Sequence, residues 1–310
     1  MKELLLNDAY KEYVAYISNR FKPTTVNWIK RNLEKHVLPI LTNKNIYEIN
    51  NSDFIKWQDY LVSLRYSNSF NSYIYSITKK FFDYLSSFYK IENYAEKFGR
   101  INSYYNVQSK TIQTWNLKEF KKFIEVVDDK VYHALFNFLF FTGVRKGELL
   151  ALQFTDIKGG YANINKTLTK ERFNGERLIM TPKSKKSNRS IRLDLRIRAE
   201  LFFLQKYYTK LYGYFDEKFY VFGGKQPLST TTLERKKNKY CELAGVKQIR
   251  IHDFRHSHAT ILYHKKIKIK YIQARLGHAD ISTTMNTYVH VDDRYEKRVY
   301  GTLNFLRLFF

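Results

Sequence analysis

The sequence has very little cysteine and no long apolar run. Its 310 residues include one cysteine, Cys241, and nowhere do 18 apolar residues follow one another. A single cysteine cannot form a disulfide within the chain, and it cannot build a CxxC motif or a Cys/His zinc module. We therefore expect an ordinary buried residue there and a reducing compartment, the cytoplasm. Because no apolar stretch begins the chain or interrupts it, we expect neither a secretory signal nor a membrane-spanning helix.

Glycine and proline are scarce as well. The chain has 12 glycines and 4 prolines, whereas 44% of its residues are hydrophobic and 17% are aromatic. This composition excludes a collagen-like repeat, a disordered chain and a small disulfide-based scaffold. A chain of 310 residues is long enough for about two domains, each with its own core.

Acidic residues are few compared with basic ones. The chain has 29 Asp and Glu residues against 54 Lys and Arg, a formal net charge of +25. Residues 1–110 contain 16 basic and 10 acidic residues, and the remaining 200 contain 38 and 19. A polyanion is the expected partner of so basic a protein. A basic membrane-surface protein would concentrate its charge on one helix, whereas this charge is spread over several segments, so we favour nucleic acid.

The first part of the chain is predicted to form a helical bundle. Apolar residues recur at helical spacing in four segments. Thr24 and Ser52 are the expected N-caps of the second and third helices, and the second should stop before Pro39. The residues expected on the apolar faces are Tyr10, Tyr13, Val14 and Ile17, then Ile29, Leu33 and Val37, then Phe54, Trp57, Leu61 and Leu64, and finally Phe70, Tyr73, Ile77, Phe81, Tyr84, Leu85 and Phe88.

A polar stretch separates this bundle from the rest. Between Ile91 and Thr114 the helical spacing fades, which we interpret as a linker between domains. The predicted division is a helical domain at 1–108, the end of the linker at 109–115, and a second domain at 116–310.

The second domain is predicted to be mainly helical with a small antiparallel β-sheet. Asn116 and Glu119 have the spacing of a capping box, and the helix from Val131 to Phe141 is so apolar that it should be central. Gly143 then supplies a sharp turn into a further helix. Three strand-like runs are expected at Tyr161–Thr169, Arg177–Thr181 and Arg189–Leu193, with later helices starting at Ser229 and Ser282.

Arg145 is the first candidate site residue. It follows the glycine turn at the start of a helix, where backbone amides and the helix dipole favour anions. Glu148 lies three residues further on the same face and can hold the guanidinium in place. Such a pair is more often a surface ion pair of little consequence. Here, however, an apolar helix in a strongly basic protein delivers the pair to one spot.

A basic segment contains the second candidate. Residues 170–198 hold ten basic and three acidic residues, centred on TPKSKKSNRSIRL. Lys185 and Lys186 are interpreted as hairpin-tip residues that contact phosphates without specificity. Lys183 differs because it follows Pro182 at a strand end and is positioned by a rigid element, which makes it a candidate proton donor.

The segment HDFRHSHAT places His252 and Arg255 one above the other on a helix. His252 and His256 also have the i, i+4 spacing of metal ligands. However, the HExxH glutamate is missing and the arginine would repel a cation, so we rank phosphate binding above metal binding. His258 is interpreted as a structural residue that is hydrogen-bonded to backbone carbonyls.

The segment LGHADISTTMNTYVH contains the last candidates. His278 precedes a capped helix, Tyr288 follows ten residues later, and His290 lies just beyond. The chain has 26 tyrosines, and a tyrosine by default packs its ring and satisfies its hydroxyl. Tyr288 is singled out only by the residues around it.

Together these four motifs resemble those of the tyrosine recombinase, or phage integrase, family. TGVRKGELLAL resembles the first arginine motif, TPKSKKSNRSI the lysine-bearing hairpin, HDFRHSHAT the His-x-x-Arg box and LGHADISTTMNTYVH the nucleophile box. They occur in the family order between residues 116 and 290, and the helical first half resembles the family's core-binding domain more loosely. Four motifs in the correct order are far more specific than any one of them.

The resemblance implies roles for the matching residues. Tyr288 is then the nucleophile, Arg145 and Arg255 grip the scissile phosphate, and Lys183 is the general acid to the leaving 5'-oxygen. Two forked guanidiniums suit the nonbridging oxygens of a phosphodiester and do not lose their protons. The covalent 3'-phosphotyrosyl bond conserves the energy of the broken diester, so neither a metal nor another cofactor is expected.

Three further residues complete the implied site. His252 and His278 join the cage by hydrogen bonding and proton handling, and Glu148 supports it as an acidic residue behind the arginines. The implied partners are double-stranded DNA, a synaptic tetramer of this chain on two duplexes, and an accessory excision or host factor. No membrane is involved. The apolar segment Tyr295–Phe310 needs cover; it can fold on its own domain, but the resemblance implies docking on a neighbouring subunit.

The resemblance favours a site-specific recombinase that integrates and excises a phage or mobile element. Residues 1–23 are too few for an arm-binding domain, a layout similar to that of Xer-type dimer resolution recombinases, which are the nearest alternative. A type IB topoisomerase shares the cage and the nucleophile but acts alone. A nonenzymatic DNA-binding protein with a decayed catalytic domain is the third alternative, and the complete set of matching residues counts against it.

Overall fold

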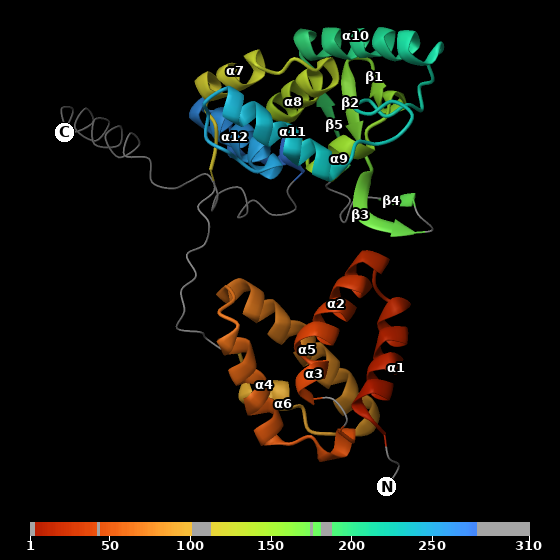
Figure 1. The fold of residues 1–310 in the computed structure, drawn as a ribbon, viewed down its shortest axis with the longest axis vertical. Coiled ribbons are helices and arrows are strands. Elements are labelled where there is room, and N and C mark those ends of the chain that lie inside the picture. The colour runs from red at the N-terminus through yellow and green to blue at the C-terminus, as the bar shows by residue number, and fades with distance from the viewer. Residues whose placement is uncertain (1–3, 42–43, 101–112, 174–175, 181–187, 278–310) are drawn as a thin grey trace, which may run out of the picture. The chain divides into compact units, whose positions relative to one another are not determined.

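The computed structural model describes residues 4–41, 44–100, 113–173, 176–180 and 188–277. The chain divides into two compact units, Met1–Thr111 and Ile112–Phe310 (Figure 1). Helices dominate both units, and small antiparallel sheets lie in the second. The predicted fold class, mainly helical with a small antiparallel sheet, is confirmed. No helix within these ranges is long and apolar enough to cross a membrane.

The first unit is a bundle of amphipathic helices. The long helix α5 contacts α1, α2 and α6, and α4 packs against α3 and α6. Aromatic residues fill the core, and the Trp57 indole donates a hydrogen bond of 2.8 Å to the His36 carbonyl. The elements are α1 (Leu6–Ser18), α2 (Pro23–His36), α3 (Leu38–Leu41), η1 (Ile46–Glu48), α4 (Asn51–Ser63), α5 (Asn68–Tyr89) and α6 (Tyr94–Phe98).

The four predicted helices exist, but two predicted caps are wrong. Helix α2 begins at Pro23, whose missing N–H costs nothing in the first turn, so Thr24 lies inside the helix. Asn50 caps α4 in place of Ser52, and Asp53 bonds back to the Asn50 backbone to complete a capping box.

The predicted linker is partly structured. Helix α6 lies within the stretch from Ile91 to Thr114, and its Ala95 is fully buried. The Tyr75 hydroxyl donates 2.9 Å to the Ala95 carbonyl, which fastens α6 to α5. A five-residue helix is too short to give a clear period, and it was missed for that reason.

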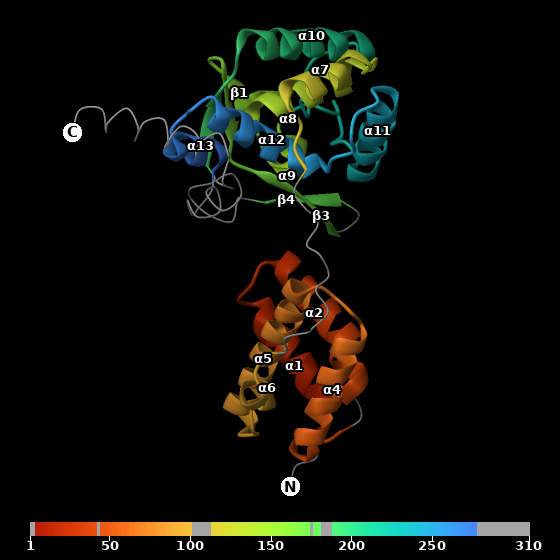
Figure 2. The ribbon, with the colours of Figure 1, turned by 90° about the vertical axis from the view of Figure 1, so that its left-hand side faces the viewer.

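The second unit is built around α8, as its apolar sequence predicts. In both views α8 lies between α10 and α12 (Figure 1, Figure 2), and its side chains belong to one large core. Asn116 and Glu119 form the predicted capping box of α7. The helices are α7 (Leu117–Glu125), α8 (Lys130–Thr142), α9 (Lys146–Ala151), η2 (Phe154–Asp156), α10 (Leu195–Tyr212), α11 (Thr230–Leu243), α12 (Ile251–His264) and α13 (Ile269–Leu276).

The strands form two separate sheets. One has the order β1–β2–β5, and its buried residues Ala162 and Ile191 face each other in register. The other is the hairpin β3–β4, which lies beside α9 (Figure 2). The predicted single run Tyr161–Thr169 is therefore wrong, because it is divided between β2 and β3. The strands are β1 (Ile157–Lys158), β2 (Tyr161–Ile164), β3 (Thr167–Phe173), β4 (Glu176–Met180) and β5 (Arg189–Arg192).

Candidate active site

Arg145 stands at the N-terminus of α9, directly after the turn that ends α8. Gly143 terminates α8 in the left-handed conformation, at φ +67°, as predicted. The Arg145 backbone N–H donates to Glu148 Oε2 at 2.8 Å, and its Nη1 donates to Glu148 Oε1 at 2.7 Å. The predicted grip of Glu148 on this arginine is therefore confirmed.

No other residue fits at the Gly143 turn. A Cβ there would lie 2.7 Å from His258 Cδ2 and 2.9 Å from Leu276 Cδ2, which is closer than atoms can pack. The Gly143 carbonyl accepts a hydrogen bond of 2.8 Å from Arg255 Nη1. The turn that delivers Arg145 therefore also brings α12 and α13 into contact with the end of α8.

Arg255 lies on α12 and is 1% exposed. Its Nη1 donates to the Gly143 carbonyl, and its Nη2 donates to the Leu276 carbonyl at 2.6 Å. A buried guanidinium needs such acceptors because desolvation of an unpaired charge is costly. The second arginine of the predicted pair is thus built into the junction of α8, α12 and α13.

Three arginine side chains donate hydrogen bonds to the C-terminal end of α13. Consecutive carbonyls there, which lack partners within the helix, accept guanidinium hydrogen bonds from three different elements. The Arg275 carbonyl accepts from Arg189 Nε at 2.7 Å, the Leu276 carbonyl from Arg255, and the Gly277 carbonyl from Arg145 Nη2 at 2.8 Å. The negative end of the helix dipole favours this arrangement. Arg145 and Arg255, far apart in the sequence, therefore converge on adjacent peptide groups.

Glu148 is the buried anion behind the arginines. Its side chain is 3% exposed, and Arg189 Nη2 donates to its Oε2 at 2.8 Å. Burial by itself raises the pKa of this carboxyl, but the hydrogen bonds and charges of Arg189 and Arg145 outweigh burial and hold the pKa below its ordinary value. Glu148 therefore remains an anion and a fixed acceptor for Arg145.

His252 lies on the exposed side of α12. Loss of hydration, followed by repulsion from Arg255 and Arg145, lowers the pKa of His252. His252 is therefore within electrostatic range of both arginines. Its ring packs edge-on against His256, with ring centroids 4.9 Å apart, and burial together with His252 lowers the pKa of His256 to about 4. Both imidazoles are neutral at pH 7, as hydrogen-bonding groups beside a cationic pair should be.

His258 is a structural residue, and that prediction is confirmed. It is 6% exposed, its Nδ1 lies 2.9 Å from the Phe140 carbonyl, and its Nε2 accepts from Arg275 Nε at 3.1 Å. These partners require a neutral ring with the proton on Nδ1. Burial and the charge of Arg275 lower the pKa of His258 to about 3.

The structure thus brings together four of the predicted site residues, Arg145, Glu148, His252 and Arg255. Lys183, His278 and Tyr288 lie outside the described residues, as do the predicted helix start at Ser282 and the segment Tyr295–Phe310. Within the part of the chain that the structure describes, no group of three or more His, Cys, Asp or Glu side chains is placed to hold a metal ion.

Sequence reasoning missed Arg189 and Gly147. Arg189 shares a strand face with the buried Ile191, and a charged residue on an inward face is a detectable signal. A Cβ on Gly147 would lie 2.4 Å from Thr167 Oγ1 and 3.0 Å from the Leu168 carbonyl oxygen. Gly147 therefore lets β3 pass directly over α9, so the hairpin is held against the arginine motif.

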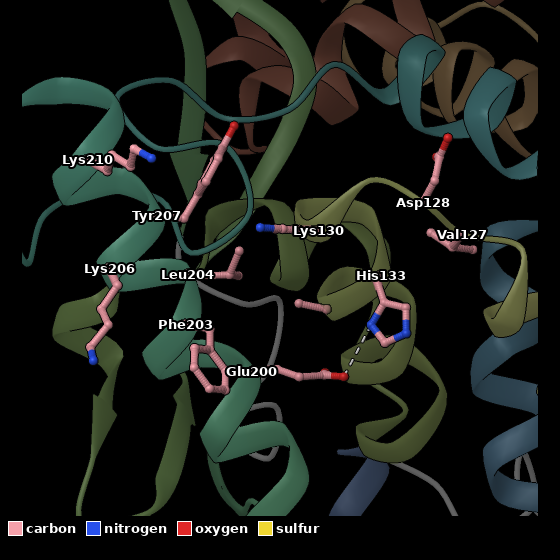
Figure 3. A pocket seen from close by; sticks show the side chains of 11 residues that line it. Val127, Asp128, Lys130, His133, Glu200, Phe203, Leu204, Lys206, Tyr207 and Lys210 are labelled. Atoms are coloured by element: carbon pink, nitrogen blue, oxygen red, sulfur yellow. Dashed lines mark ion pairs between the residues drawn. The ribbon is translucent and has the colours of Figure 1, made fainter.

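A cavity of about 580 Å³ lies elsewhere in the second unit, between α8 and α10 (Figure 3). Its walls are mainly apolar, and His133 Nδ1 lies 3.3 Å from Glu200 Oε1 across it. Lys130, Lys206 and Lys210 stand among the lining residues. None of the predicted site residues lines this cavity.

Comparisons with known proteins identify the family. The model of the phage integrase family matches residues 111–294, and that of the N-terminal SAM-like domain of phage integrases matches residues 5–62. The ICEBs1 integrase of Bacillus subtilis is 27% identical over 300 residues, covering 94% of this chain and 80% of its own. Transposase A from transposon Tn554 of Staphylococcus aureus is 25% identical over 345 residues, covering 97% and 92%.

Solved structures share the fold. The integrase of transposon Tn1549 in complex with transposon right end DNA has a TM-score of 0.72 at 18% identity, covering 97% of this chain and all of its own. A lambda integrase tetramer bound to a Holliday junction has a TM-score of 0.66 at 16% identity, covering 94% and 79%. The chain belongs to the phage integrase family and is a tyrosine recombinase, a DNA strand-exchange enzyme.

Proposed function

We propose that this recombinase cuts DNA with Tyr288 as nucleophile, Arg145 and Arg255 as ligands of the scissile phosphate, and Lys183 as general acid. One observation carries the proposal: two arginines from distant motifs donate to the adjacent carbonyls of Leu276 and Gly277. Their convergence creates the concentrated positive charge that a phosphodiester under attack requires.

The proposed reaction is a reversible transesterification. The phenolic oxygen of Tyr288 attacks phosphorus and passes its proton to one of the site histidines, His252 or His278. The bond from phosphorus to the 5'-oxygen breaks, and Lys183 gives that oxygen a proton. A 3'-phosphotyrosyl bond replaces the diester. A 5'-hydroxyl from the same or another duplex then attacks phosphorus and gives its proton to Lys183, while Tyr288 recovers its proton from the histidine. His252 and His278 hydrogen-bond the phosphate and handle protons, with Glu148 behind them.

Arg145 and Arg255 differ in how accessible their guanidiniums are to a phosphate. The hydrogen bonds of Arg145 to Glu148 Oε1 and Gly277 use two of its five N–H donors, and its side chain is 35% exposed. Within the described residues it therefore retains donors for a phosphate. Arg255 is buried, so its contact with phosphate requires that the guanidinium become accessible when DNA binds.

We propose that the natural substrate is the DNA at the ends of a mobile element. The ICEBs1 integrase and the Tn554 transposase, both named for mobile elements, match nearly the whole of this chain. The competing role is Xer-type dimer resolution. A type IB topoisomerase would act on one duplex, whereas a recombinase requires two specific sites.

The proposed domains are a helical domain at 1–108 that binds the DNA core site and a catalytic domain at 116–310, with the end of the linker at 109–115. The net charge of +25 supports binding to double-stranded DNA. Cytoplasmic location and an accessory excision or host factor belong to the same proposal.

Assembly is proposed to be a tetramer on two duplexes; a lambda integrase tetramer is known bound to a Holliday junction. The apolar segment Tyr295–Phe310 is proposed to dock on a neighbouring subunit. Deletion of the residues after Lys297 should spare binding to one site and abolish synapsis in gel-shift assays. Recombination by the truncated protein at the full-length rate would contradict this assignment.

A two-plasmid assay tests the function. Covalent attachment sites are first mapped on genomic DNA, and the mapped sequence is then placed on one plasmid or on two. The proposal predicts recombinant product only when two sites are present, and none with Tyr288→Phe. Relaxation of a supercoiled plasmid without any site, at the rate seen with sites, would favour the topoisomerase.

A further inference from the structure

Arg189 on β5 is a buried arginine whose side chain is hydrogen-bonded to two parts of the arginine site. Its side chain is 7% exposed. All three of its nitrogens donate: Nε to the Arg275 carbonyl at 2.7 Å, Nη1 to Glu148 Oε1 at 3.1 Å, and Nη2 to Glu148 Oε2 at 2.8 Å. A guanidinium engaged in this way is turned away from solvent, and its partners are protein groups.

Arg189 and Arg145 share the Glu148 carboxylate and bond to neighbouring carbonyls of one helix end. Glu148 Oε1 accepts from both Arg145 and Arg189, so the carboxylate is shared between the two guanidiniums. The Arg275 carbonyl accepts from Arg189, and the Gly277 carbonyl accepts from Arg145. Both carbonyls lie at the C-terminal end of α13, one in its last turn and the other at its C-cap. Arg189 therefore ties β5 to Glu148, which it shares with Arg145, and to the end of the same helix whose Gly277 carbonyl accepts from Arg145.

The bidentate geometry is what gives this link its stiffness. Two parallel N–H bonds to the two carboxylate oxygens fix the plane of Glu148 as well as its distance. A lysine in place of Arg189 would keep the charge but supply a single nitrogen, which cannot reach both oxygens and the helix end together. The orientation of the carboxylate, and with it that of Arg145, would then be lost.

We propose that Arg189 is a positioning residue for phosphodiester cleavage: it orients Glu148 and the end of α13, and these in turn hold Arg145 in the geometry that receives the phosphate. This inference rests on the proposed function of Arg145. It assigns Arg189 no contact with DNA.

The charged surroundings of Glu148 make the proposal testable by pH. Arg145 faces it from the start of α9 and Arg189 faces it from β5, while Arg275 of α13 lies within electrostatic range of Arg189. Removing Arg189 deletes the largest charged contribution that holds the pKa of Glu148 down. The carboxylate of the variant would then take up a proton at a higher pH, and Arg145 would be released there.

The experiment compares Arg189→Lys and Arg189→Met with Arg192→Met, an exposed arginine on the same strand. A nicked suicide substrate is mixed with excess protein, so that the single-turnover rate at saturation is separated from DNA affinity. Both Arg189 variants should bind within about threefold of wild type and cleave on the order of 10- to 100-fold more slowly, as for a misplaced reacting group. Arg192→Met should cleave at the wild-type rate.

The pH profile and a double variant complete the test. The acidic limb of the cleavage rate should move to higher pH in Arg189→Met, and adding Glu148→Gln should abolish that limb and cost little further rate. Wild-type cleavage rates in both Arg189 variants would overturn the proposal, and so would an unmoved acidic limb. If Arg189→Met does not fold, Arg189→Lys carries the comparison of cleavage rates, because it keeps the charge and loses the bidentate contact. No cleavage by wild type would instead refute the proposed function.

Discussion

Arg189 and Glu148 meet side by side: Nη1 donates to Oε1 at 3.1 Å and Nη2 donates to Oε2 at 2.8 Å. One oxygen of the same carboxylate also accepts from Arg145 at 2.7 Å. Arg145, which we propose receives the scissile phosphate, thus shares its carboxylate with a second arginine that lies on a different element. These shared hydrogen bonds determine what individual substitutions in this cluster should do.

Arg145→Lys should impair chemistry far more than binding. Lysine keeps the positive charge but cannot reach Glu148, the Gly277 carbonyl and a phosphate at once. The single-turnover cleavage rate should fall about 10²-fold, as on loss of one preorganised donor to a developing charge. Gel-shift affinity should change by less than about fivefold, since one phosphate contact among many is altered. A lysine variant that cleaves at the wild-type rate would exclude Arg145 from the phosphate site.

Gly147→Ala should displace the hairpin from α9. The added Cβ would meet Thr167 Oγ1 at 2.4 Å and the Leu168 carbonyl oxygen at 3.0 Å, so β3 must shift. Overpacking of this kind costs about 1–3 kcal/mol in the free energy of unfolding, measurable by urea denaturation. The double variant with Thr167→Ala removes the closer contact and should recover part of that loss. Equal stability of the single variant and wild type would show that β3 yields without strain.

His258 should make stability depend on pH. Its pKa is about 3 in the folded protein against an ordinary value of 6.5, so above 6.5 the ring is neutral in both states. As the pH falls below 6.5 the unfolded chain binds a proton that the folded chain does not, and the free energy of unfolding decreases. The slope from this one group is about 1.4 kcal/mol per pH unit.

His258→Gln should reduce that slope. The amide can still donate to the Phe140 carbonyl and accept from Arg275, but it does not titrate. Urea unfolding across the window from about pH 4 to 6.5 measures the difference, and His264→Gln, at the exposed end of the same helix, is the matched control. An unchanged slope in His258→Gln would mean that the folded ring accepts a proton.

DNA binding should weaken steeply with salt. A net charge of +25 implies many phosphate contacts, and the affinity should fall linearly on a log–log plot with a slope near −0.9 per contact. Lys185→Gln and Lys186→Gln should each reduce that slope by about 1. Affinity that is independent of salt between about 50 and 200 mM would contradict a role for the surplus charge.

Patterns within one element were readable from the sequence, and contacts between elements were not. The apolar run of α8, the Gly143 turn and the pairing of Arg145 with Glu148 depend on neighbours three or four residues apart, and these predictions are confirmed. The predicted cap of α2 failed because Pro23 starts that helix without a side-chain cap, and that of α4 failed because several capping residues stand side by side there. Arg189 reaches Glu148 across 41 positions of sequence, a pairing that no local period encodes.

The account depends most directly on where DNA becomes attached. Wild type and Tyr288→Phe are each incubated with a suicide substrate that loses its 5'-hydroxyl fragment, and the denatured products are separated by electrophoresis and digested for peptide mapping. The account predicts a covalent complex with wild type alone, with the 3'-phosphate on the peptide that contains Tyr288. A complex of equal yield with Tyr288→Phe, or a 3'-phosphate mapped to another side chain, would contradict it.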